Sequence, residues 1–254
     1  MKLFFSGALS ELQEGINIMQ KRLGYTIDKG GIPVKVLKGE NGIKVFGDEK
    51  GATIEYERKI EFFRGLGLLI EALSDGGEFN ISEKANFKTD GMMVDCSRNS
   101  VMTVESIKKL LEMMAAMGLN MLMLYTEDTY EVEGYPYFGY MRGRYTYDEL
   151  KECDDYAYEL GIEMIPCIQT LAHLFSALKW DSCKIPKDTE DVLMIGDDKT
   201  YEFIDDIIKA ASKPYRSKKI HIGMDEAFGL GRGAYLRKNG YRETIDICVS
   251  ILKK

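Results

Sequence analysis

Residues 104–125 read VESIKKLLEMMAAMGLNMLMLY and change their pattern at one glycine. Before Gly118 the apolar side chains recur every three or four residues, which is the spacing of a helix with one buried face. After Gly118 comes a short apolar run, which is typical of a buried strand. Glycine is also the residue that most often closes a helix. The segment therefore predicts a helix that is followed at once by a strand.

The same alternation of strand-like and helix-like segments continues through residues 88–254. Strands and helices in this order pair in parallel through right-handed crossovers, so the sequence predicts an α/β fold. The expected strands are 92–95, 120–125, 163–168 and 219–223, and the expected helices are 104–117, 147–160, 201–211 and 233–252. A complete (β/α)8 TIM barrel needs about 250 residues. Residues 88–254 are therefore expected to form the first four βα units of a truncated barrel, or a smaller open sheet.

Residues 1–87 follow a different pattern, which predicts a small α+β domain. The expected helices are 10–23 and 58–73, and the expected short strands between them are 34–36, 43–45 and 53–56. The glycine-rich segments 39–42 and 47–51 are typical of hairpin turns. We therefore expect a meander with helices on one face, a solvated opposite face and no catalytic residues.

Composition limits the classes of partner. The chain has 254 residues, of which 34 are basic and 41 acidic, so its net charge is −7, and 45% of its residues are hydrophobic. These are ordinary values for a folded protein. No apolar run reaches the roughly 20 residues of a membrane-spanning helix, and an acidic surface repels nucleic acid. Neither a membrane nor nucleic acid is expected as a partner, whereas neutral small molecules are compatible with this surface.

The N-terminus and the cysteines bear on location. The chain starts MKLFF, but Glu11 and Glu14 interrupt the apolar region that an export signal needs. Five cysteines without CxxC spacing favour neither a disulfide framework nor a zinc clip. We therefore expect a cytoplasmic protein.

Polar or ionisable side chains follow the end of every expected strand in residues 88–254. In parallel α/β proteins, ligands bind at this edge. Of the three Asp-Glu dipeptides in the chain, only the one at 225–226 follows a buried type of strand. The candidate residues are Arg98 after the first strand, Glu127 and Asp128 after the second, His173 after the third, and Asp225 and Glu226 after the fourth.

Two loops allow more than one interpretation. Residues 130–145 are rich in aromatic residues and glycine, which fits either stacking on sugar faces or a small satellite core under a long loop. Residues 229–233, GLGRG, resemble a phosphate loop only faintly, since they lack Gly-Lys-Ser/Thr and follow two carboxylates. We expect these glycines to let the backbone turn tightly beneath the site.

The segment 221–226, HIGMDE, resembles the catalytic strand of glycoside hydrolase family 20, the β-N-acetylhexosaminidases. The loop 135–145 and the segment 165–174, IPCIQTLAHL, resemble bacterial members of the same family. Residues 1–87 are similar in position and pattern to the family's small non-catalytic α/β domain. The resemblance implies an exo-acting, retaining hydrolase of terminal β-linked GlcNAc or GalNAc residues.

The resemblance also implies the chemistry. In this family the 2-acetamido oxygen of the substrate itself attacks the anomeric carbon, so the protein supplies no nucleophile. Glu226 would protonate the leaving oxygen, and Asp225 would accept the acetamido N–H and stabilise the positive oxazolinium. An ionised Asp225 next to Glu226 would help to keep Glu226 protonated. No cofactor and no metal ion are implied.

The substrate-binding residues follow from the resemblance by position. Arg98 would donate hydrogen bonds to hydroxyls of the terminal sugar. Asp128 and His173 would form a polar pair that supports the acid, with Glu127 beside them. Trp180 is the only tryptophan of the chain, whereas several tryptophans from later strands wall the family's acetamido pocket.

Two other functions are alternatives. One is a non-catalytic carbohydrate-binding or assembly module derived from a half-barrel. The other is a metal-dependent hydrolase that uses Asp95, His173, His221 and Asp225, which the absence of HxH and HExxH spacings disfavours.

Overall fold

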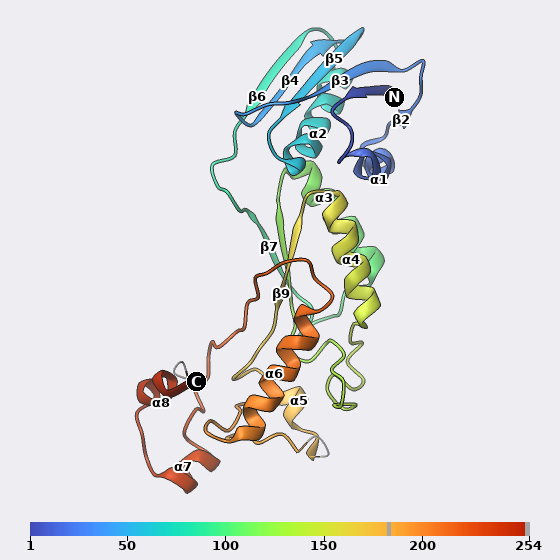
Figure 1. The fold of residues 1–254 in the computed structure, drawn as a ribbon. Coiled ribbons are helices and arrows are strands. Elements are labelled where there is room, and N and C mark those ends of the chain that lie inside the picture. Colours follow the sequence, from blue (N-terminus) through green and yellow to red (C-terminus); the bar gives the residue numbers. More distant parts are fainter. Residues whose placement is uncertain (182–183, 252–254) are drawn as a thin grey trace. The chain divides into compact units, whose positions relative to one another are not determined.

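The computed structural model describes residues 1–181 and 184–251 (Figure 1). The chain divides into two units that interleave along the sequence. The first unit contains residues 1–92, 103–122 and 153–164, and the second contains residues 93–102, 123–152 and those from 165 onward.

The first unit contains a mixed six-stranded sheet with the strand order β2-β1-β3-β5-β4-β6. Its strands are β1 (Lys2–Gly7), β2 (Thr26–Ile27), β3 (Ile32–Lys38), β4 (Ile43–Asp48), β5 (Gly51–Tyr56) and β6 (Phe79–Glu83). The pairs β1–β3 and β3–β5 are parallel, whereas β4 is antiparallel to both β5 and β6. The predicted meander is therefore wrong, because β5 lies between β3 and β4.

Of the two predicted hairpins, one is confirmed and one is wrong. Residues 47–51 join the antiparallel strands β4 and β5. Asp48 Oδ1 closes this turn by accepting the backbone N–H groups of Lys50 and Gly51, at 2.8 and 3.2 Å. Residues 39–42 connect β3 to β4, which are not neighbours in the sheet.

Two helices, α1 (Gln13–Leu23) and α2 (Lys59–Asp75), lie on one face of this sheet (Figure 1). Both were predicted from their apolar spacing. Alternate residues of β3, Val34 and Val36, are buried, and Phe62, Leu66 and other side chains of α2 are fully buried. Lys35 on β3 is exposed, as expected for a solvated opposite face. The first unit thus has its own core between sheet and helices.

A second sheet has the order β7-β8-β9, with β7 (Gly91–Asp95), β8 (Met121–Tyr125) and β9 (Glu163–Cys167). Backbone hydrogen bonds join Asn120 to Asp90 and Cys96 to Tyr125, so β7 and β8 are parallel. Helix α3 (Val104–Met117) begins at Thr103, whose side chain accepts the N–H of Ser106, and it ends at Gly118 with a φ of 81°. These βα units confirm the predicted α/β alternation.

The expected fourth strand, 219–223, is not a regular strand in the structure. It runs beside β9 through one parallel bridge, between Cys167 and His221. The N–H of His221 bonds to the carbonyl of Pro166, and the N–H of Ile168 bonds to the carbonyl of His221, both at 2.9 Å. Pro166 has no N–H to offer the carbonyl of Lys219, and Gly223 leaves the extended region with a φ of 51°. The ladder is short for these two reasons.

The helices of the later part partly follow the prediction. The helices α4 (Tyr147–Glu159) and α6 (Asp198–Ser212) lie where they were expected, while α5 (Phe175–Leu178) was not predicted. The single helix expected at 233–252 is wrong. It is split into α7 (Ala234–Asn239) and α8 (Thr244–Ile251) by Gly240, whose φ is 74°, and residue 252 lies outside the described residues. None of the helices that the structure describes is long and apolar enough to span a membrane.

Candidate active site

The segment that leaves β9 lies directly against residues 221–223. The N–H of Thr170 bonds to the carbonyl of Gly223 at 3.1 Å. A Cβ at position 223 would overlap the carbonyl oxygen of Ile168 and the side-chain amide of Gln169. Glycine is therefore required for this close approach, which brings Gln169 next to Asp225.

The imidazole of His173 lies between two carboxylates. Its Nε2 is 3.5 Å from Oδ2 of Asp225 and 3.4 Å from Oε2 of Glu226. The side chains of Asp225 and Glu226 are 55% and 59% exposed, so solvent and ligands can reach them. These three residues, which were predicted from two separate strand ends, are thus brought into one cluster.

Two members of this cluster have strained backbones. His173 has a φ of 56° and Glu226 a φ of 54°, in the left-handed region that non-glycine residues rarely adopt. Such a conformation costs about 1–3 kcal/mol per residue and is found most often at functional sites. The carbonyl of Glu226 accepts the N–H of Phe228 at 2.7 Å, which helps to hold the turn.

A chain of hydrogen bonds connects the exposed Asp225 to the buried Glu127. The Gln169 Nε2 donates to Oδ1 of Asp225 and to the hydroxyl of Tyr125, both at 3.1 Å. The Tyr125 hydroxyl donates to Oε1 of Glu127 at 3.3 Å. The hydrogen bond from Gln169 holds the pKa of Asp225 below its ordinary value. Burial raises the pKa of Glu127 above its ordinary value.

Asp128 is fully buried and contacts Arg142 rather than His173. Its Oδ1 lies 3.2 Å from Nε of Arg142, and its Oδ2 is buried without a partner among the described residues. Burial raises the pKa of Asp128, and the charge of Arg142 opposes this shift. The Arg142 guanidinium also donates to the carbonyl of Ser97 at 2.7 Å and lies 3.9 Å from Glu127. Asp128 and His173 make no direct contact within the described residues, and their joint support of the acid stays a prediction.

Arg98 lies at the end of β7, as predicted. Its Nε donates to Oδ2 of Asp95 at 2.6 Å, and its guanidinium carbon lies 4.9 Å from the ring centre of Tyr125. Its side chain is mainly exposed, which leaves the terminal nitrogens accessible to a ligand. Tyr125 thus links Arg98 to the chain of bonds that ends at Asp225.

The glycine-rich turn after Glu226 encloses a carboxylate from elsewhere in the chain. Asp188 is buried, and its Oδ2 accepts the N–H of Gly231 at 2.6 Å. Its Oδ1 accepts the N–H groups of Gly233 and Tyr235 at 3.0 and 2.7 Å. A Cβ at Gly233 would overlap the Asp188 carbonyl. These glycines therefore do let the backbone turn tightly, and Asp188 is the anion that the turn binds.

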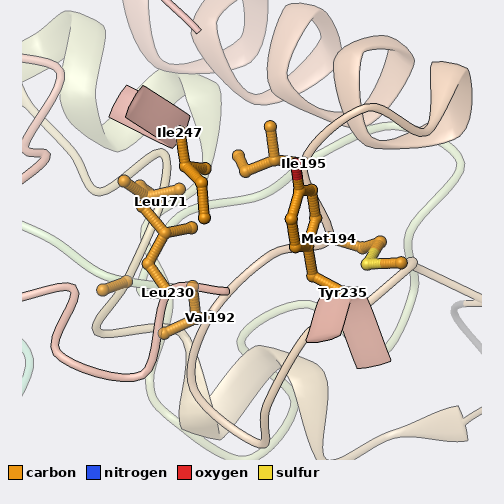
Figure 2. Close-up of a cluster of buried hydrophobic side chains, with 8 residues drawn as sticks. Leu171, Val192, Met194, Ile195, Leu230, Tyr235 and Ile247 are labelled. Atoms are coloured by element: carbon orange, nitrogen blue, oxygen red, sulfur yellow. The ribbon is translucent and has the colours of Figure 1, made fainter. Parts of the chain in front are cut away.

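Apolar packing anchors the same turn. A cluster of buried side chains surrounds Leu230 (Figure 2). Met224 and Ala227, on either side of the Asp225-Glu226 pair, pack against this cluster. Its buried members are Leu171, Ala172, Val192, Met194, Ile195, Leu230, Tyr235 and Ile247. Hydrophobic contacts thus fix the backbone that carries both acids.

The site contains residues that sequence reasoning missed, namely Tyr125, Gln169, Arg142 and Asp188. Tyr125 and Gln169 lie at strand ends, where every polar residue could have been included. Arg142 stands between Gly139 and Gly143, with φ values of 67° and 65°, which fold it back onto the two preceding acids. Among the residues that the structure describes, no three His, Cys, Asp or Glu side chains are grouped so that they could hold a metal ion. This also applies to the alternative set that contains Asp95 and His221.

Paired carboxyl groups at the strand ends of an α/β fold are the groups that most glycoside hydrolases use to cleave a glycosidic bond. Residues 87–246 match the model of the catalytic domain of glycosyl hydrolase family 20, and the chain belongs to this family. The family inferred from the segments 221–226 and 165–174 is thereby confirmed.

Relatives and solved structures agree with this assignment. The chain is 29% identical over 157 residues to Beta-hexosaminidase 3 of Arabidopsis thaliana, covering 58% of this chain and 29% of that protein. It is 26% identical over 259 residues to a Beta-hexosaminidase of Porphyromonas gingivalis, covering 86% and 33%. The chain therefore spans about a third of the length of these relatives.

The fold resembles that of a family 20 exo-β-N-acetylglucosaminidase from Vibrio harveyi, crystallised with N-acetylglucosamine. The TM-score is 0.81 at 18% identity, and the match covers 99% of this chain and 48% of that one. A family 20 β-N-acetylhexosaminidase from Streptomyces coelicolor gives a TM-score of 0.73 at 19% identity, with coverages of 93% and 58%. These similarities confirm the α/β fold class.

Proposed function

We propose that the protein is an exo-acting, retaining β-N-acetylhexosaminidase that removes terminal GlcNAc or GalNAc residues from oligosaccharides. The observation that carries the proposal is the imidazole of His173 within 3.5 Å of both Asp225 and Glu226. Membership of family 20 and relatives named as β-hexosaminidases support the same activity.

The proposed reaction needs no nucleophile from the protein. The acetamido oxygen of the terminal sugar attacks the anomeric carbon, and the bond to the leaving oxygen breaks as Glu226 donates its proton to that oxygen. This attack is intramolecular, so most of its entropy cost is met when the substrate is bound. Glu226 then takes a proton from the water that opens the oxazolinium, which returns the β-anomer.

The two acids stand in different surroundings, which suits two different tasks. Asp225 accepts the hydrogen bond from Gln169, which favours its ionised form. An ionised Asp225 can accept the acetamido N–H and stabilise the positive charge that forms on the ring. Glu226 contacts His173, which is positioned to orient it for proton transfer. Arg98, with exposed donors, is suited to bind hydroxyls of the terminal sugar.

The domain boundaries and the cellular location that the sequence predicts stay proposals. Residues 1–87 would be the small non-catalytic domain, and residues 88–254 would supply the first four βα units of the family's (β/α)8 barrel. A cytoplasmic location, and the absence of membrane and nucleic-acid partners, are proposed on the sequence alone.

The test compares p-nitrophenyl N-acetyl-β-glucosaminide with p-nitrophenyl β-glucoside. We expect turnover of the acetamido sugar only, with the β-anomer as the first product detected by NMR. Equal turnover of both glycosides would exclude the substrate-assisted mechanism. Saturable binding of the acetamido sugar without hydrolysis would instead favour the non-catalytic sugar-binding module.

A further inference from the structure

The short segment 188–193 contacts both of the loops that meet at the candidate active site. It folds into a tight turn, in which the N–H of Asp188 bonds to the carbonyl of Val192 at 2.8 Å. An antiparallel bridge between Lys187 and Leu193 closes the turn. The segment belongs to the same unit as both loops, so its contacts with them lie within one compact body.

On one side, this segment holds the loop that carries His173. The N–H of Leu193 bonds to the carbonyl of Leu171 at 3.0 Å. The carbonyl of Asp191 accepts the N–H of Leu174 at 3.3 Å, and the carboxylate of Asp191 accepts the N–H of the first residue of α5 at 3.1 Å. These bonds are made before and after His173 in the sequence, so they fix the backbone on both sides of its φ of 56°.

On the other side, the segment holds the turn that follows the acid pair. The carboxylate of Asp188 accepts three backbone N–H groups of this turn, and the carbonyl of Asp188 accepts a fourth, from Ala234, at 2.8 Å. Thr189 lies against Gly229, where a Cβ would come within 3.1 Å of the threonine side chain. These contacts begin three residues after Glu226, so they limit how far this strained residue can move.

Apolar packing joins the same three parts of the chain. Leu171 from the histidine loop, Val192 from the segment and Leu230 from the turn belong to one buried cluster, and each is at most 2% exposed (Figure 2). A left-handed backbone at a non-glycine residue persists only where the surrounding contacts hold it in place. His173 and Glu226 both have such a backbone, and the segment supplies contacts of this kind to the loops of both.

We propose that residues 188–193 brace the active site, and that Asp188 and Asp191 are positioning residues that keep His173 in contact with the acid pair. This proposal rests on the proposed function, since its kinetic consequence concerns the proton that Glu226 would donate. Both aspartates act through backbone N–H groups and not through the substrate. A displacement of about 1 Å at the reacting groups can lower a rate about 10²-fold, so the brace can affect catalysis from outside the sugar-binding residues.

The test uses two substrates that differ in their need for an acid. p-Nitrophenol leaves readily without a proton, whereas p-methoxyphenol needs one, so a misplaced Glu226 should affect p-methoxyphenyl N-acetyl-β-glucosaminide more. In Asp188→Asn, kcat/KM should fall about tenfold for this substrate and less than about threefold for the p-nitrophenyl glycoside. Asp191→Ala should show the same order with smaller losses. A loss of folded protein would lower both values by the same factor.

Asp197→Ala is the matched control. The carboxylate of Asp197 also accepts a backbone N–H, from Lys199 at 3.1 Å, but it caps α6. Both kcat/KM values of this variant should equal those of the parent, and far-UV circular dichroism checks that each variant is folded. The brace is refuted if folded Asp188→Asn and Asp191→Ala lose the same factor on both substrates, or lose no activity.

A readout that needs no hydrolysis separates the brace from the proposed function. His173 and His221 are the only histidines of the chain, so His221→Asn assigns the Cε1–H NMR signal of His173. This signal should shift in Asp188→Asn and Asp191→Ala, and should stay in place in the control.

The two readouts together distinguish the failures. A parent that hydrolyses neither glycoside, with a His173 signal that shifts in both brace variants, would support the brace and overturn the function. Hydrolysis of both glycosides by the parent, with an unchanged ratio of the two kcat/KM values and an unmoved signal in the variants, would overturn only the brace. No hydrolysis and an unmoved signal would overturn both.

Discussion

Replacement of Asp188 by alanine tests how the turn that follows the two acids is held. The carboxylate of Asp188 accepts three backbone N–H groups, from Gly231, Gly233 and Tyr235, at 2.6–3.0 Å. Asp188→Ala removes all three bonds and leaves their donors in a buried turn. The next residues toward the N-terminus are those that carry Asp225 and Glu226, so their placement depends on this turn.

The expected loss of stability follows from these three hydrogen bonds. Three hydrogen bonds to a charged group, at about 1.5–3 kcal/mol each, give an upper range of about 4.5–9 kcal/mol. Water that enters the vacated space offsets part of this loss. We therefore expect the free energy of unfolding to fall by about 3–5 kcal/mol, which lies at the lower end of that range. Asp188→Asn keeps one oxygen for Gly233 and Tyr235, and should lose about 1–3 kcal/mol.

The assay is urea unfolding followed by far-UV circular dichroism, with formate or chloride at equal ionic strength. Formate has the size and charge of the missing group, so it should bind in the turn of Asp188→Ala. At a formate concentration ten times its Kd, the stability gain would be about 1.4 kcal/mol. The reasoning is refuted if Asp188→Ala loses less than about 1 kcal/mol, or if formate stabilises the parent as much as it stabilises Asp188→Ala.

Three further predictions concern the acids and their partners. Glu226→Gln and Asp225→Asn should each lower kcat/KM about 10²–10⁴-fold with an unchanged urea midpoint, and near-parental activity in either would place the site elsewhere. Gln169→Leu removes the hydrogen-bond donor that lowers the pKa of Asp225. The acid limb of the pH profile of kcat/KM should therefore move to higher pH. An acid limb that does not move would contradict the role of Gln169. Arg142→Met leaves buried Asp128 without its cation and should cost about 3–5 kcal/mol at pH 8. Burial raises the folded-state pKa of Asp128, so protonation favours the folded state. The urea midpoint of Arg142→Met should therefore fall less below that of the parent at pH 5 than at pH 8. An equal fall at both pH values would count against the Asp128–Arg142 pair.

Local sequence signals predicted most of the helices, but neither α5 nor the break at Gly240. The segment 104–117 has its cap at Thr103 and its terminating glycine at Gly118, so everything that starts and ends the helix lies within a few residues. The strands were harder, because strand pairing depends on distant partners. Residues 39–42 have hairpin composition, yet the strand after them pairs with β5 and β6, and the short strands β1, β2 and β6 were missed.

The candidate site shows the same division between local and distant effects. The position of Asp225 and Glu226 after an apolar segment was readable, and so was His173 after β9. The partner of Asp128 was not, since Arg142 returns to it through a loop with two left-handed glycines. Asp188 could not be foreseen, because its partners are backbone N–H groups more than 40 residues away, which no side-chain motif marks.

The central claim is that the acetamido group of the substrate performs the nucleophilic attack, and a series of substrates tests it directly. p-Nitrophenyl glycosides of glucosamine that carry acetyl, fluoroacetyl, difluoroacetyl and trifluoroacetyl groups differ mainly in the basicity of the amide oxygen. If that oxygen attacks, kcat/KM should fall steeply with each added fluorine. A kcat/KM that stays constant across the four substrates would show that the amide does not take part, and would contradict the roles given to Asp225 and Glu226.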